Sequence, residues 1–143
     1  MKRKAWLGAA ALTLAAALSL GASAQAAAPA KSRVVFQVSD GDPGKWNLTL
    51  NNAHNVQQDL GADKVDIEIV AYGPGIGMVK ADAVIANRLA EAVHDGIQVV
   101  ACENTMKALK LTKDDMNVSV GYVRAGVVEL MKRQGEGWAY IKP

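Results

Sequence analysis

Short apolar runs alternate with helical patterns along most of the chain. Strands that alternate with helices pair in parallel and are joined by right-handed crossovers. The pattern therefore predicts an α/β three-layer sandwich around a five-stranded, mostly parallel sheet. The predicted strands are residues 34–38, 65–71, 97–101, 118–123 and 138–141, and the predicted helices are residues 43–60, 81–93, 104–109 and 125–133.

Two of these elements carry details that a structure can test. In the second strand, Asp66 and Glu68 alternate with apolar residues. This alternation is typical of a strand with one wetter, more solvent-exposed face, or of one whose polar face is covered only when a partner binds. The last helix has four apolar positions, which are Val127, Val128, Leu130 and Met131. Residues 72–77 are rich in glycine and are expected to end the second strand in a turn before the second helix.

The first 26 residues have the pattern of an export signal. Lys2-Arg3-Lys4 precedes an apolar segment over 5–20, and the small residues at 22–26 offer cleavage sites. A membrane-spanning helix is the alternative, but the apolar segment is short, rich in alanine and followed by no stop-transfer pattern. We expect a cleaved signal peptide over 1–26, one domain over 27–143, a periplasmic or secreted location, and no membrane association after cleavage.

The net charge of the chain changes sign when the predicted signal peptide is left out. The whole chain has 16 Lys and Arg against 14 Asp and Glu, but three of the basic residues lie at positions 2–4. The remaining domain therefore has a formal charge close to −1. It has no basic stripe interleaved with aromatic residues, so nucleic acid is not an expected partner.

Cys102 is the only cysteine, so the chain forms no internal disulfide. It lies between the predicted strand 97–101 and a predicted helix that Asn104 or Thr105 could cap. Backbone N–H groups and the positive end of a helix dipole favour the thiolate, which is the nucleophilic form. The junction is therefore a candidate site for thiol chemistry.

Cys102 also has a purely structural interpretation. Free cysteine is among the residue types most often buried, and it could simply complete the strand. Glu103 favours this alternative, because an adjacent carboxylate raises a thiol pKa unless it points away. Position favours the reactive interpretation, and sequence alone leaves both open.

Candidate binding residues cluster after three predicted strands. Ligands of open parallel sheets bind beyond the carboxyl ends of the strands, and the loops after the first three strands would meet there if those strands are neighbours. Backbone N–H groups of the glycine-rich turn could then face Cys102 and hold a small anion or a persulfide. The candidate binding residues are Asp40, Gly41, Tyr72, Gly73, Gly75, Glu103 and Asn104.

Other motifs point away from a cofactor or a metal. Glycines at 73, 75 and 77 lack the spacing of a dinucleotide fingerprint and are not followed by the Lys-Ser/Thr of a P-loop, so a tight turn is favoured over a phosphate cradle. His54 and His94 have no ligand spacing with Cys102. We expect no cofactor and no metal site.

Several runs together resemble one protein family. Residues 99–106, 111–115, 120–130 and 137–143 are similar to the DsrE/DsrF-like family, above all to its exported members. The resemblance implies a compact α/β/α fold and assembly into trimers or hexamers. It also implies a sulfur relay, in which one cysteine at this strand end accepts sulfur as a persulfide and passes it to a partner protein. Only Cys102 can inherit that role.

This chain departs from the relay proteins in two respects. Glu103, Asn104 and Thr105 replace the basic residues that follow the acceptor cysteine in cytosolic members. The signal peptide would also separate the protein from cytosolic sulfur donors. Two hypotheses follow: a periplasmic sulfur carrier acting through Cys102, and a non-catalytic oligomeric binding or scaffold protein in which Cys102 is structural.

Overall fold

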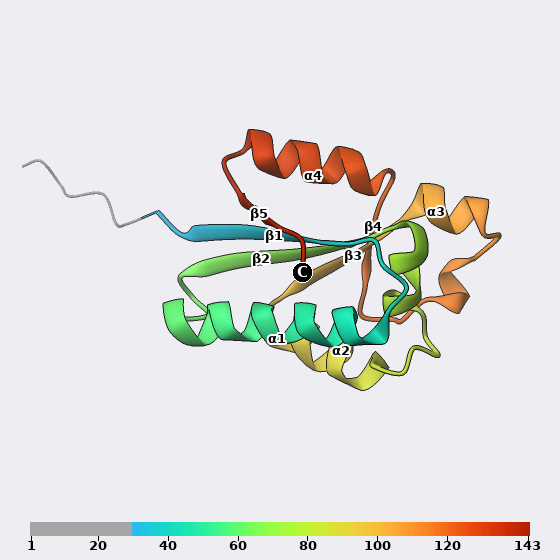
Figure 1. Cartoon of the computed structure of the whole chain (residues 1–143), viewed down its shortest axis with the longest axis horizontal. Coiled ribbons are helices and arrows are strands. Elements are labelled where there is room, and N and C mark those ends of the chain that lie inside the picture. Colours follow the sequence, from blue (N-terminus) through green and yellow to red (C-terminus); the bar gives the residue numbers. More distant parts are fainter. Residues whose placement is uncertain (1–29) are drawn as a thin grey trace, which may run out of the picture.

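A parallel sheet forms the centre of the molecule, and the computed structural model describes it over residues 30–143 (Figure 1). Neighbouring strands lie in the order β4-β3-β2-β1-β5 and all pair in parallel. The predicted α/β class and five-stranded sheet are therefore confirmed. The strands are β1 (Ser32–Val38), β2 (Val65–Ala71), β3 (Gln98–Cys102), β4 (Gly121–Val123) and β5 (Ala139–Ile141).

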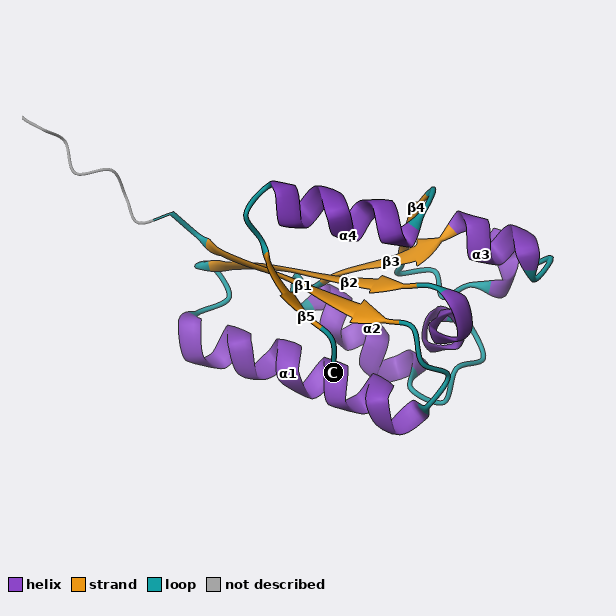
Figure 2. Ribbon diagram, turned by 45° about the horizontal axis from the view of Figure 1, so that its top comes forward, coloured by secondary structure: helices purple, strands orange, loops and turns teal. Residues whose placement is uncertain are grey.

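Helices cover both faces of the sheet. Figure 2 shows α1 and α2 on one face and α4 on the other, with α3 beyond the end of β3. A 3₁₀ helix, η1, follows β2, and a second, η2, follows α3. The bounds are α1 (Pro43–Leu60), η1 (Gly73–Val79), α2 (Ala86–His94), α3 (Glu103–Ala108), η2 (Lys113–Asp115) and α4 (Gly126–Gly135).

Two apolar clusters hold the layers together. The larger lies between the sheet and α1 and α2, where Phe36, Leu50 and Leu89 are fully buried. The smaller lies under α4 and contains Val35, Val70, Leu130 and Trp138. Burying one such side chain contributes about 1.5–3 kcal/mol, so both faces of the sheet depend on their helices.

The segment after η1 is less helical than its pattern predicts. The helix expected from residue 81 begins at Ala86. The reason is that Lys80 forms an antiparallel bridge with Met116, and the Ala81 N–H donates to the Asp115 carbonyl at 3.0 Å. These contacts hold Lys80 extended and leave residues 81–85 mostly in turns, where local periodicity favours a helix. The expected turn over 72–77 is instead mostly the regular helix η1.

The fourth strand is shorter than predicted. Its pattern predicted residues 118–123, but the strand starts at Gly121. The Asn117 side chain accepts from the Ser119 N–H at 3.0 Å, and the Val120 N–H donates to the Asn117 carbonyl at 3.2 Å. These bonds form a turn that leaves Val118 fully exposed.

The wetter face predicted for β2 is wrong at Glu68. Its side chain is only 2% exposed, because α4 lies over it and Arg133 forms an ion pair with it. Arg133 also pairs with Glu129 at 2.9 Å and Glu136 at 3.2 Å. The polar residue in the pattern therefore marks a buried salt bridge between sheet and helix.

Only part of the expected apolar face of α4 is buried. Leu130 packs on the sheet, whereas Val127, Val128 and Met131 are more than half exposed.

The proposed signal peptide, residues 1–26, lies outside the described residues. Within residues 30–143, no helix is long and apolar enough to cross a membrane.

Candidate functional site

The first three strand ends meet, as expected, because β1, β2 and β3 are adjacent in the sheet. The Tyr72 N–H donates to the Val38 carbonyl at 3.1 Å, which joins the ends of β2 and β1. The Gly73 N–H donates to the Thr105 hydroxyl at 3.0 Å, which joins η1 to α3. The three loops therefore form one continuous edge around the end of β3.

Glycines allow these loops to approach closely. A Cβ on Gly75 would lie 2.2 Å from the Val38 carbonyl oxygen, so only glycine fits. At Gly41 a Cβ would lie 3.5 Å from that of Pro74, which is ordinary contact. Gly75 therefore lets the loop after β2 pack closely against the end of β1, whereas the space at Gly41 would admit a Cβ.

Asp40 serves helix α1 rather than the sulfur. Its carboxylate lies 3.4 Å from the Lys45 ammonium, and its carbonyl accepts from the Trp46 indole N–H at 2.7 Å. Both partners lie in the first turn of α1. Asp40 therefore anchors the β1–α1 connection at the edge.

Cys102 is both the last residue of β3 and the N-cap of α3. The expected cap, Asn104 or Thr105, is wrong because the helix starts one residue earlier than predicted, at Glu103, and Cys102 precedes it. The Gly126 N–H donates to the Cys102 sulfur at 3.3 Å, and the sulfur lies 4.0 Å from the Arg124 carbonyl. Cys102 is 4% exposed, so this polar cradle encloses most of the side chain.

The hydrogen bonds around Cys102 favour its thiolate. Burial alone raises the thiol pKa, but a hydrogen bond from the Thr105 hydroxyl and others from backbone N–H groups act in the opposite direction. The Gly126 N–H donates to the sulfur at 3.3 Å, whereas the nearby N–H groups of Asn104 and Thr105 favour the thiolate without forming a cap hydrogen bond to it. Together they outweigh burial, so the pKa of Cys102 lies below its ordinary value.

Glu103 does not prevent this lowering. Its side chain is exposed, so water screens its charge from the buried sulfur. Asn104 is also exposed, and its backbone N–H donates to the Arg124 carbonyl at 3.1 Å. Glu103 and Asn104 thus contribute backbone position rather than side-chain chemistry.

Thr105 is a site residue that sequence reasoning missed. Its hydroxyl accepts the Gly73 N–H, which leaves the hydroxyl proton free to point at the sulfur. The glycine-rich segment therefore acts on Cys102 through Thr105, whereas direct N–H contacts had been expected. The available signal was a threonine three residues after an N-cap, where side chains and the cap commonly hydrogen-bond.

Gly126 is the second missed residue. A Cβ there would lie 3.1 Å from two Tyr72 atoms and 3.2 Å from a Val70 methyl carbon. Glycine lets α4 approach the sheet closely enough for its first N–H to reach the sulfur. Tyr72 packs over this contact, and its pKa is raised, chiefly by burial, with the negative charge of a Cys102 thiolate adding to the shift.

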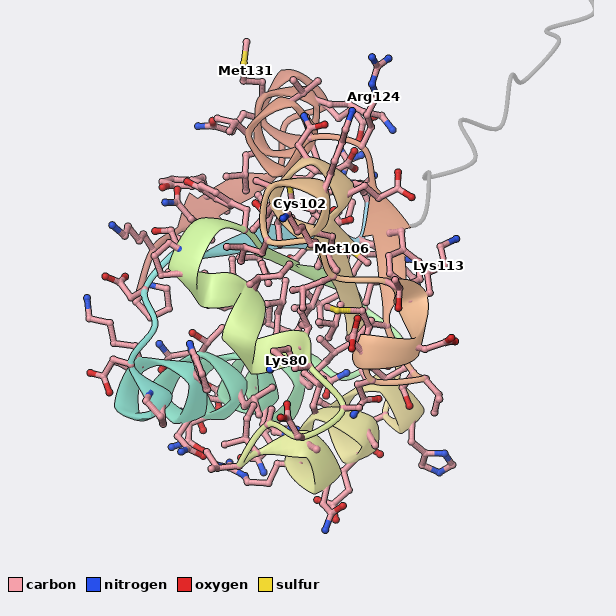
Figure 3. All side chains as sticks on the ribbon, turned by 90° about the vertical axis from the view of Figure 1, so that its right-hand side faces the viewer. Lys80, Cys102, Met106, Lys113, Arg124 and Met131 are labelled. Atoms are coloured by element: carbon pink, nitrogen blue, oxygen red, sulfur yellow. The ribbon has the colours of Figure 1, made fainter. Side chains whose placement is uncertain are left out.

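Figure 3 looks onto this edge from beyond the strand ends. Cys102 lies beside the start of α3 and below α4, while the Arg124 side chain extends away from it toward solvent. Within residues 30–143, no group of three His, Cys, Asp or Glu side chains is placed to hold a metal ion. The described chemistry is thus that of one hydrogen-bonded thiol.

Comparisons with known proteins agree with this fold. The chain is similar to a protein of unknown function from Methanobacterium thermoautotrophicum, at 35% identity and a TM-score of 0.75, over 79% of this chain and 100% of that one. A conserved protein of unknown function from Bacteroides thetaiotaomicron has 14% identity and a TM-score of 0.63, over 78% of this chain and 95% of that one, which shows a shared fold. No curated protein matches.

A family model decides the relationship. The model of the DsrE/DsrF-like family matches residues 32–143, which include every strand and helix of the described structure. The archaeal relative matches over its whole length. The chain therefore belongs to the DsrE/DsrF-like family.

Proposed function

We propose that the protein is a sulfur carrier that accepts sulfur as a persulfide on Cys102. The observation that carries the proposal is a buried thiol at the end of β3 that accepts the Gly126 N–H at 3.3 Å, among hydrogen-bond donors that lower its pKa. A structural cysteine in an apolar strand end needs no such donors. Family membership supports a role of the sulfur-relay type.

The transfer needs one nucleophilic step. The Cys102 thiolate attacks the outer sulfur of a donor persulfide R–S–SH. A new bond forms between the Cys102 sulfur and the outer sulfur, and the donor S–S bond breaks. Its electron pair leaves with the donor as R–S⁻, which takes a proton from water. No external oxidant or reductant is required, and the proposal assigns no general base because the donors around Cys102 favour its thiolate.

The same hydrogen-bond donors suit the product. A persulfide ionises more readily than a thiol, so it is an anion that requires stabilisation. The Thr105 hydroxyl and the Gly126 N–H already converge on the sulfur position. Attack by an acceptor thiol on the outer sulfur then restores the Cys102 thiolate, which these donors also stabilise.

We further propose that the carrier works outside the cytosol as a homo-oligomer, a trimer or hexamer, with a thiol protein as its sulfur acceptor. The pattern at 1–26 supports export. The exposed Val127, Val128 and Met131 on α4 support assembly, because apolar side chains grouped on one helix face are typical of interfaces.

One observation favours a second candidate function. Cys102 is 4% exposed, which suits a structural residue in a binding or scaffold protein. In that case the hydrogen bonds would only satisfy a buried sulfur. The carrier and the scaffold differ in whether the native thiol reacts.

Loading with sulfur separates the two. The purified domain is incubated with glutathione persulfide and, separately, with benzyl persulfide, and its intact mass is measured before and after addition of a thiol reductant. The carrier gains one sulfur atom, which the reductant removes and which Cys102→Ser never gains. Absence of this gain in the folded wild-type protein would favour the scaffold.

A further inference from the structure

A groove lies beside the Cys102 cradle, between η1 and α3. It has a volume of about 440 Å³ and is formed by Gly73, Pro74, Asn104, Thr105, Ala108 and Leu109. We call these six residues the apolar groove. Its size is in the range of sites for small organic molecules.

The groove is joined to the thiol by Thr105. This residue lines the groove and lies in the first turn of α3, three residues after the N-cap Cys102, where its hydroxyl helps to lower the pKa of the thiol. On the opposite wall, Gly73 donates to Thr105, and no described atom lies within 4 Å of the position its Cβ would take. A molecule in the apolar groove would therefore lie one side chain away from the nucleophile.

The chemistry of the walls selects the kind of molecule. None of the residues described as lining the groove carries a charge. Leu109 is 56% exposed, so an apolar side chain of this wall lies in water. An anion such as thiosulfate would lose hydration here without gaining a counter-charge, whereas a hydrocarbon group would cover apolar surface.

We propose that the apolar groove binds the uncharged hydrocarbon body of a low-molecular-weight organic persulfide, so that the sulfur donor is an alkyl or aryl persulfide. This inference rests on the proposed function of Cys102. The body R lies against Ala108 and Leu109, and its –S–SH end extends past Thr105 to the thiolate. The transfer is the one written above: the Cys102 sulfur bonds to the outer sulfur, and R–S⁻ leaves and is protonated by water.

Donor selectivity tests the inference. Benzyl persulfide and glutathione persulfide carry the same reacting group on an apolar and a charged body, and loading rates are measured by intact mass. Ala108→Trp fills the groove, and we expect it to lower the ratio of the benzyl rate to the glutathione rate at least tenfold. Val84→Trp, at an exposed position outside the groove, should leave the ratio unchanged. An unchanged ratio in Ala108→Trp would overturn the proposal.

Binding without reaction separates this inference from the proposed function. In the Cys102→Ser protein, benzyl methyl sulfide should produce saturable NMR shifts of the Ala108 and Leu109 methyl groups. Shifts without any loading of wild type would overturn the carrier function and the donor role but keep the site. Loading without shifts would overturn the groove alone. If Ala108→Trp instead dissociates an oligomer in light scattering, the groove is an interface between copies and the proposal is wrong.

Discussion

Replacing Thr105 with valine tests how the thiolate is stabilised. Valine has nearly the shape of threonine but removes the hydroxyl that hydrogen-bonds to the Cys102 sulfur. A hydrogen bond to a charged group contributes about 1.5–3 kcal/mol, and about 1.4 kcal/mol corresponds to a factor of ten. Thr105→Val should therefore lower the ionisation constant of the thiol by about ten- to a hundredfold.

The same substitution removes the acceptor of the Gly73 N–H, which is bonded at 3.0 Å in a partly buried position. Loss of that bond should lower the free energy of unfolding by about 1 kcal/mol. The protein should remain folded, since a domain of this size typically has about 5–15 kcal/mol of stability. The effect on the thiol can then be measured in the native state.

The assay is a pH titration of thiolate absorbance in the ultraviolet, with Cys102→Ser subtracted to remove the tyrosine signal. Thr105→Ser is the matched control because it keeps the hydroxyl. We expect Thr105→Val to titrate at a higher pH than wild type and Thr105→Ser to stay close to wild type. Identical titration of Thr105→Val and wild type would refute the role assigned to the hydroxyl.

Three further predictions concern the packing around the site. Gly126→Ala places a Cβ 3.1 Å from neighbouring atoms, which should move the N–H away from the sulfur. We expect it to lower the free energy of unfolding in urea by about 1–3 kcal/mol and to raise the Cys102 pKa in the same ultraviolet titration. Unchanged stability and titration would contradict this. Gly75→Ala places a Cβ 2.2 Å from a backbone oxygen, so we expect little folded protein by circular dichroism, and a native spectrum would count against the close packing. Burial raises the pKa of Glu68 in the folded state, so its contribution to stability is full below pH 4.5 and is lost as pH rises through the raised folded pKa. Glu68→Gln should remove this pH dependence of the free energy of unfolding, measured in urea from pH 4 to pH 7. Arg133→Met should destabilise the protein more at pH 7 than at pH 4. Equal effects at both pH values would disprove the linkage.

Much of the fold could be predicted because its elements are locally encoded. Helix α1 begins at Pro43 after an Asp42 cap and ends before Gly61, as its residues indicate. The prediction failed where distant contacts decide the backbone. Lys80 pairs with Met116, so the residues that follow it form turns before α2 despite their helical pattern. No local periodicity carries that information.

Burial of charge was the second failure. The pattern of β2 was interpreted as a wet face because Glu68 is acidic. Its partner, Arg133, is 65 residues away in sequence, and nothing in either local pattern joins them. A buried acid with a distant base looks like a surface acid when only the strand is considered.

The candidate site was only partly predictable. Cys102 and the meeting of three loops follow from strand ends in a parallel sheet. Thr105 and Gly126 were missed because their roles depend on atoms brought together by tertiary packing. The Gly126 N–H reaches the sulfur only because α4 lies close to β2, which sequence spacing cannot show.

The most direct test of the account is the rate at which iodoacetamide alkylates Cys102 in the folded protein, measured from pH 5 to pH 9. The account requires a thiol that reagents can reach and that ionises at a lower pH than a free thiol. It predicts a rate that rises with pH at lower pH values than the rate of a free thiol does. Labelling that occurs only after unfolding in urea, or a rate that follows a free thiol, would contradict it.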